Sequence, residues 1–128
     1  MKVKVAETAG FCFGVKRAVD KVYELIDTEQ KPIFTLGPII HNQDVVDDLT
    51  RRGARIVDSI AELHPDECVV IRSHGVSAKV YEELEQAGNP YVDATCPFVA
   101  KIHRIVEKES KAGSHIVIIG DPDHPEVV

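Results

Sequence analysis

Hydrophobic residues follow one another along the chain in two alternating patterns. Short apolar runs rich in valine and isoleucine, typical of strands, stand at residues 2–5, 33–36, 55–57, 68–72, 91–93 and 115–119. Between them, apolar positions keep the spacing of a helix that buries one face, most clearly at 15–26 and 98–106. Strands that alternate with helices predict an α/β fold with a parallel sheet built from βα units.

Residues with capping preferences support these boundaries. Pro97 is suited to a first helical position with Cys96 as the N-cap, and Gly53, Gly88 and Gly113 stand where helices should end. The sequence therefore predicts a helix that begins directly after Cys96.

The chain contains no glycine-rich or serine-rich linker, so a domain boundary is placed near the helix start just described. We expect residues 1–96 to form a first α/β domain and residues 97–128 to form the incomplete start of a second. The last residues, DPDHPEVV, follow a strand pattern and resemble the opening of a new helix. This pattern predicts that the chain is the N-terminal piece of a longer protein.

Composition narrows the function classes. The 128 residues carry a net charge of −6 and 44% hydrophobic residues, without the basic stripe that a nucleic-acid surface needs. No apolar run is long enough to cross a bilayer, and no secretory signal pattern is present, so we expect a cytoplasmic protein with no nucleic-acid or membrane partner. Three widely spaced cysteines in that compartment indicate metal binding, catalysis or plain burial.

Reactive side chains gather after the predicted strands. In parallel sheets ligands bind outside the carboxyl ends of the strands, so the residues at those positions are candidates for chemistry. They are Cys12, His41, His74, Cys96, His124 and Glu126. The other histidines, at 64, 103 and 115, lie in a loop, on a polar helix face and at a strand start, and we expect them to be inert.

Cys12 and Cys96 have the same predicted position, after a strand and at the first turn of a helix. The helix dipole at such a position favours thiolates. Thiolates bind iron or zinc, or attack electrophiles. Structural zinc sites usually use close cysteine pairs, which this chain lacks, and Arg17 is one position short of the Cys-x5-Arg spacing of cysteine phosphatases. Widely separated cysteines favour an iron–sulfur cluster between domains, whereas Cys68 in an apolar run is expected to be buried.

The histidine motifs indicate an anion site. His74 lies between Ser73 and Gly75, which provide a hydroxyl and a close backbone approach, and His124 is followed two residues later by Glu126. A histidine and a carboxylate at a loop–helix junction can bind an anion and transfer a proton. Two other hypotheses stay open on these residues: a cysteine-nucleophile phosphatase or transferase, and a non-enzymatic α/β module whose histidines cap helices.

Five strings in this order, AGFCFGVKRAV, GPIIHN, RSHGV, DATCPFV and GDPDHPEV, resemble the N-terminal part of the 4-hydroxy-3-methylbut-2-enyl diphosphate reductases of the non-mevalonate isoprenoid pathway. The resemblance covers essentially the whole chain. It implies an oxidoreductase with three pseudo-symmetric α/β domains around a 4Fe-4S cluster, in which residues 1–11 pair within the last domain. The electron donor would be ferredoxin or flavodoxin.

The same resemblance implies roles for the candidate residues. Cys12 and Cys96 would be cluster ligands, and a third cysteine would lie beyond residue 128. His41, His74 and His124 would contact the allylic diphosphate or its hydroxyl. Glu126, next to His124, would deliver the proton that lets the hydroxyl leave as water, and reduction would give isopentenyl or dimethylallyl diphosphate.

Overall fold

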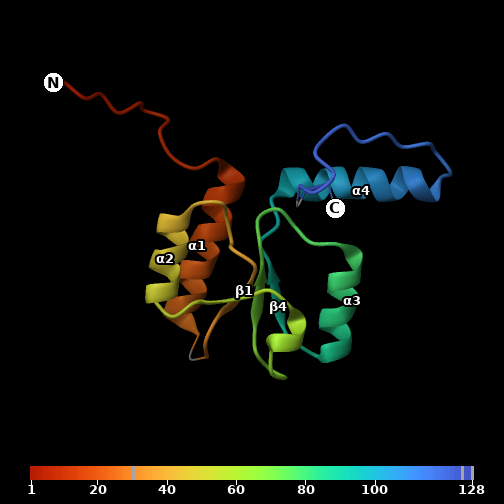
Figure 1. Cartoon of the computed structure of the whole chain (residues 1–128), viewed down its shortest axis with the longest axis horizontal. Coiled ribbons are helices and arrows are strands. Elements are labelled where there is room, and N and C mark those ends of the chain that lie inside the picture. The colour runs from red at the N-terminus through yellow and green to blue at the C-terminus, as the bar shows by residue number, and fades with distance from the viewer. Residues whose placement is uncertain (30, 125, 128) are drawn as a thin grey trace.

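Four parallel strands form the centre of the computed structural model, which describes residues 1–29, 31–124, 126 and 127 (Figure 1). They are β1 (Phe34–Leu36), β2 (Arg55–Val57), β3 (Val69–Ile71) and β4 (Tyr91–Asp93), in the order β2-β1-β3-β4. Every residue of the central strands β1 and β3 is buried, as expected for parallel strands covered on both faces. The predicted α/β fold with a parallel sheet is confirmed.

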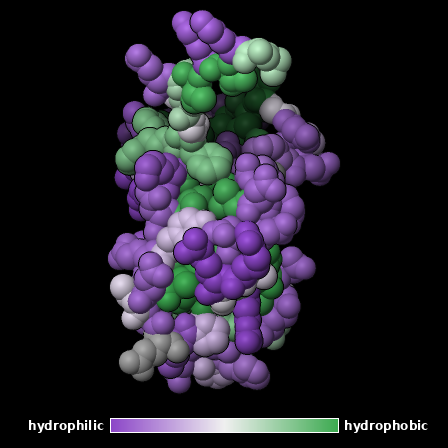
Figure 2. Space-filling view, turned by 90° about the vertical axis from the view of Figure 1, so that its left-hand side faces the viewer, coloured by the Kyte–Doolittle hydropathy of each residue, from purple (hydrophilic) through white to green (hydrophobic). Residues whose placement is uncertain are grey.

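Helices cover both faces of this sheet. α1 (Phe13–Thr28) and α2 (Gln43–Arg51) lie on one side, whereas α3 (Ala78–Ala87) and the short 3-10 helix η1 (Ile60–Glu62) lie on the other (Figure 1). Side chains of β3 alternate between the two layers: Val70 belongs to the α1 and α2 core, and its neighbours belong to the α3 core. The α1 and α2 side of the molecule is largely hydrophilic outside, with apolar atoms visible between the polar ones (Figure 2).

The helix ends agree with the capping residues of the sequence. Gly88 closes α3 in the left-handed conformation, with φ of 75°, and Cys96 is the N-cap of the last helix, α4 (Pro97–Lys111). Gly53 and Gly113 also have positive φ, just past α2 and α4. The predicted helix starts and stops are therefore confirmed at these residues.

Two predicted strands are wrong. Residues 2–5 and 115–119 are not strands in the described chain, and side chains such as Val3 and Val117 are each 77% exposed. A strand exists only where a neighbour accepts and donates its backbone hydrogen bonds, and neither segment pairs with the four-stranded sheet. The predictions that Cys12 and the pair His124 and Glu126 follow strands are therefore also wrong.

α4 is packed differently from the other helices. It lies across one end of the sheet and α3, with the following segment looped back over it (Figure 1). Only Val99 of this helix is buried. Among the described residues, no helix is both long and apolar enough to span a membrane.

Candidate functional site

The loops after three strands are joined at the carboxyl end of the sheet. The backbone N–H of Ser73, after β3, donates to the carbonyl of Ile39, after β1, with an N···O distance of 3.3 Å. The N–H of Cys96, after β4, donates to the carbonyl of Ser73 at 2.8 Å. These bonds hold the segments that carry His41, His74 and Cys96 beside one another.

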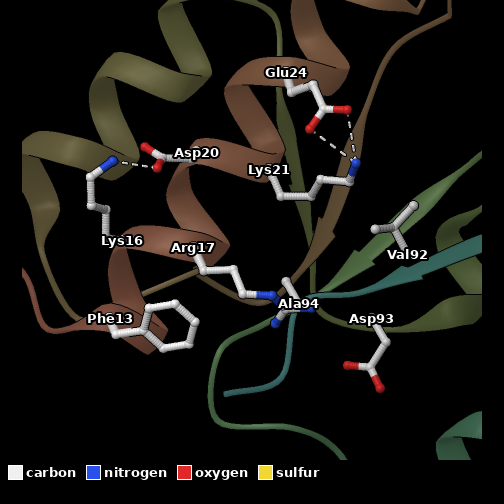
Figure 3. Close-up of a pocket in the computed structure, with 9 residues that line it drawn as sticks. All are labelled: Phe13, Lys16, Arg17, Asp20, Lys21, Glu24, Val92, Asp93 and Ala94. Atoms are coloured by element: carbon white, nitrogen blue, oxygen red, sulfur yellow. Dashed lines mark hydrogen bonds and ion pairs between the residues drawn. The ribbon is translucent and has the colours of Figure 1, made fainter. Parts of the chain in front are cut away.

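Cys96 stands on a backbone that several groups hold in place. Asp93 Oδ1 accepts a hydrogen bond from the N–H of Thr95 at 2.8 Å, and Arg17 Nη1 donates to the carbonyl of Thr95 at 3.0 Å. In Figure 3 the Arg17 side chain extends from α1 toward Ala94 at the end of β4. Arg17, which would bind a phosphate under the phosphatase hypothesis, is therefore hydrogen-bonded to the segment before Cys96.

The first turn of α1 lies directly against Cys96. A Cβ atom placed on Gly14 would be 2.4 Å from Cys96 Sγ and 2.9 Å from its Cβ, so only glycine fits this contact. Cys12, two residues earlier, is the N-cap of α1 and is exposed, and its side chain caps no backbone group. The two cysteines therefore begin neighbouring helices, as predicted, although no strand precedes Cys12.

Three histidine rings stand in a row near these loops. The ring centroids of His41 and His74 are 4.4 Å apart, and the ring of His124 meets that of His74 edge-on at 6.3 Å. The sequence predicted that each of these histidines follows a strand at one edge of the sheet; this is confirmed for His41 and His74, whereas His124 lies beside them without following a strand. Their roles stay predictions.

His74, in the middle of the row, is held in its neutral form. Burial lowers the pKa of His74 below its usual value, and the neighbouring His41 lowers it further, while the carboxylate of Glu126 opposes the shift. Its Nδ1 atom is buried without a hydrogen-bond partner in the described part of the chain. A buried polar nitrogen without a partner is costly, so this position is suited to contact with a ligand.

The tautomer of His124 follows from its backbone contact. The N–H of Glu126 donates to His124 Nδ1 at 3.2 Å, so a neutral His124 carries its proton on Nε2. Both side chains are exposed, and the Glu126 carboxylate acts on the pKa of His74. The Nε2–H group of His124 can therefore donate a hydrogen bond, and the Glu126 carboxylate is close enough to His74 to act on its pKa.

Other sequence predictions have mixed outcomes. Cys68 is half-buried rather than buried as predicted, and this burial raises the pKa of its thiol, which stays protonated at neutral pH. His103 is not remote: its Cε1 atom would be 3.1 Å from a Cβ on Gly75, at the margin of the site. Sequence patterns missed Thr95, whose buried Oγ1 has no hydrogen-bond partner in the described chain, because a threonine before a cysteine carries no distinctive signal.

The described residues do not complete a metal site by themselves. Across residues 1–29, 31–124, 126 and 127, no group of three or more histidine, cysteine, aspartate or glutamate side chains is arranged to hold a metal ion. Cys12 and Cys96 are therefore at most a partial ligand set.

Comparisons with known proteins agree with one another. Residues 3–128 match the family described as LytB protein. The chain is 51% identical to the 4-hydroxy-3-methylbut-2-enyl diphosphate reductase of Alkaliphilus oremlandii and 48% identical to that of Caldanaerobacter subterraneus, covering 100% of this chain and 46% of each relative. The chain thus spans about half the length of the curated relatives it matches.

Solved structures show the same similarity. The reductase of Plasmodium falciparum aligns with a TM-score of 0.90 and 31% identity over 94% of this chain and 38% of its own. A structure described as (E)-4-hydroxy-3-methyl-but-2-enyl diphosphate reductase, the terminal enzyme of the non-mevalonate pathway, aligns with a TM-score of 0.84 and 41% identity, covering 98% of this chain and 44% of its own.

Proposed function

The chain belongs to the LytB protein family, and from that premise we propose that it supplies one part of a 4-hydroxy-3-methylbut-2-enyl diphosphate reductase. The reaction would replace the allylic hydroxyl by hydrogen, taking up two electrons and two protons and releasing water, to give isopentenyl or dimethylallyl diphosphate. The observation that carries the proposal is that Cys96 lies on loops bonded to those of His41 and His74 at the carboxyl end of the sheet, with the first turn of the helix that begins after Cys12 packed against it.

The residues present fit an iron–sulfur cluster held in part by this chain. The absence of a side chain on Gly14 lets the first turn of α1 approach Cys96 Sγ, which brings the helix that begins after Cys12 beside the second sulfur. Cys12 and Cys96 would hold a 4Fe-4S cluster together with a cysteine from the remaining half of the family's length. The cluster would supply single electrons and an open iron position that acts as a Lewis acid.

The histidines would bind the diphosphate and orient it. His74 is neutral in the folded chain, so its unpartnered Nδ1 can accept a hydrogen bond from the substrate hydroxyl or, in the tautomer protonated there, donate one to a phosphate oxygen. His124 presents an Nε2 proton to the same anion, because its Nδ1 accepts the Glu126 N–H. His41, stacked beside His74, would extend this surface.

Glu126 would act as the general acid. A protonated carboxyl group near the hydroxyl can transfer its proton as the carbon–oxygen bond breaks, so that the group leaves as water. The backbone contact of Glu126 with His124 keeps acid and anion-binding group on one turn.

The remaining proposals concern organisation and partners. We infer that residues 1–96 are a first domain and 97–128 the start of a second within three similar domains. Ferredoxin or flavodoxin in the cytoplasm would donate the electrons.

The test joins residues 1–128 to the remaining C-terminal part of the Alkaliphilus oremlandii relative and purifies this chimera without oxygen. Cys12→Ser and Cys96→Ser should each strip iron, because each removes a cluster ligand, whereas Cys68→Ala should retain it. Iron per chain is measured beside reduction of the allylic diphosphate with dithionite and a viologen. The 128-residue chain alone should be catalytically silent. Equal iron loss from Cys68→Ala would contradict the ligand assignment.

Roles at the substrate are separated in the same chimera. Glu126→Gln should keep diphosphate affinity and lower kcat by about a hundredfold, the scale of removing a general acid. His74→Ala should instead weaken binding. If Glu126→Gln weakened binding as much as His74→Ala and left kcat intact, the two assignments would be exchanged.

A further inference from the structure

Arg17 joins α1 to the segment that carries Cys96, across 78 positions of sequence. Its Nη1 donates to the carbonyl of Thr95, directly before Cys96, at 3.0 Å. The side chain crosses a groove between α1 and β4, in which the neighbouring Lys21 pairs with Glu24 on the helix surface (Figure 3). Among the basic side chains drawn in Figure 3, Arg17 points away from α1 and toward the end of β4.

The bond is one of several that fix the backbone before Cys96. Asp93 Oδ2 accepts a hydrogen bond from the Tyr81 hydroxyl of α3 at 3.0 Å, and its Oδ1 accepts the Thr95 N–H. The N–H of Cys96 is bonded to Ser73. Contacts from α3 and from the loop after β3 therefore hold this segment to the sheet, while Arg17 ties it to α1.

Gly14 and Arg17 act on the same helix face. They are three positions apart, so they stand one above the other along α1. Gly14 sets how closely the helix can approach Cys96, and Arg17 adds a charge-assisted hydrogen bond one turn later. A helix held at two points along its axis resists both sliding and rotation relative to Cys96.

We propose that Arg17 is a positioning residue that keeps the Cys12 end of α1 in register with Cys96, and so sets the separation of the two sulfur atoms. The consequence for an iron cluster rests on the proposed function. The register of the two thiols is a property of the chain itself and can be measured without iron.

The first experiment measures that register in the 128-residue chain carrying Cys68→Ala, so that only the two thiols of interest react. A short bifunctional maleimide links Cys12 to Cys96, and mass spectrometry follows the intramolecular product over time. Arg17→Ala should slow linkage about three- to tenfold, the range expected when one hydrogen bond that holds two groups together is lost. Arg17→Lys should recover most of the rate, because an ammonium group can donate to a single carbonyl oxygen.

The matched control is Arg104→Ala. Arg104 also donates a guanidinium hydrogen bond to a backbone carbonyl, that of Ala100 at 3.1 Å, but within α4 itself. Its loss should leave the linkage rate unchanged, and urea unfolding of every variant separates loss of register from loss of the fold. Linkage at the unsubstituted rate in a folded Arg17→Ala chain, or equal slowing in Arg104→Ala, would overturn the proposal.

The second experiment uses the chimera with the Alkaliphilus oremlandii sequence. Arg17→Ala should change the electron paramagnetic resonance spectrum of the reduced cluster and shift its midpoint potential, while Arg104→Ala should not. A chimera that binds no iron before any substitution would remove the proposed function and leave the linkage result standing. Iron-loaded Arg17→Ala with an unchanged spectrum and potential would overturn the role of Arg17 at the cluster.

Discussion

α1 and α4 begin in the same way and are packed in opposite ways. Each has a cysteine as its N-cap, Cys12 or Cys96, and neither cysteine side chain caps its helix. Four apolar residues of α1 are buried against the sheet. They are Ala18, Val19, Val22 and Leu25. α4 leaves Phe98, Ile102 and Ile105 exposed by 69%, 59% and 50%.

The difference shows what helical periodicity predicts and what it leaves open. A repeating apolar stripe determines which face of a helix avoids water, but the partner that covers it must come from elsewhere in the chain. Uncovered apolar side chains on one helix mark a surface that packs against something else. The exposed stripe of α4 therefore supports the proposal that it opens a second domain.

The largest expected difference between α1 and α4 concerns the truncation of one aliphatic residue in each helix. Leu25→Ala in α1 should lower the free energy of unfolding by about 2–4 kcal/mol, because it leaves a cavity in the core. Ile102→Ala in α4 should change it by no more than about 0.5 kcal/mol. Urea unfolding followed by circular dichroism measures both. Equal destabilisation would mean that α4 is as well covered as α1.

A smaller effect is expected at the second residue of each helix. Gly14→Ala should lower the free energy of unfolding by about 1–3 kcal/mol, because the added methyl group overlaps Cys96. Glycine to alanine within a helix otherwise stabilises by up to about 1 kcal/mol, so the sign of the change is diagnostic. Phe98→Ala, at the matching position of α4, should be nearly neutral. A stabilising Gly14→Ala would show that the two segments are not in contact.

The smallest expected effect concerns His74 and the pH dependence of the free energy of unfolding. Burial lowers the pKa of His74 in the folded chain, so the unfolded chain binds more protons as the pH falls. The stability that neutral His74 contributes is complete above its unfolded pKa of about 6.5 and is lost as the pH falls from there through its lower folded pKa. Unfolding from about pH 7.5 to 5.5 should therefore depend less steeply on pH in His74→Gln than in the unsubstituted chain.

Much of the fold could be predicted because its signals are local. Strand runs, helical spacing and the caps at Gly88 and Cys96 depend on neighbours a few positions apart, and the structure agrees at these points. The meeting of His41 and His74 was also predictable, since the carboxyl ends of parallel strands share one edge, whereas His124 joins them from a segment that is not a strand.

The features that the sequence does not reveal depend on residues far apart along the chain. Residues 2–5 and 115–119 have strand-like composition, yet pairing requires a free sheet edge in reach, which composition does not reveal. The contacts of Gly14 with Cys96 and of Arg17 with Thr95 likewise arise only when α1 docks beside β4. Local preferences determine which elements can form, whereas hydrogen-bond pairing and close packing between distant segments determine which side chains meet.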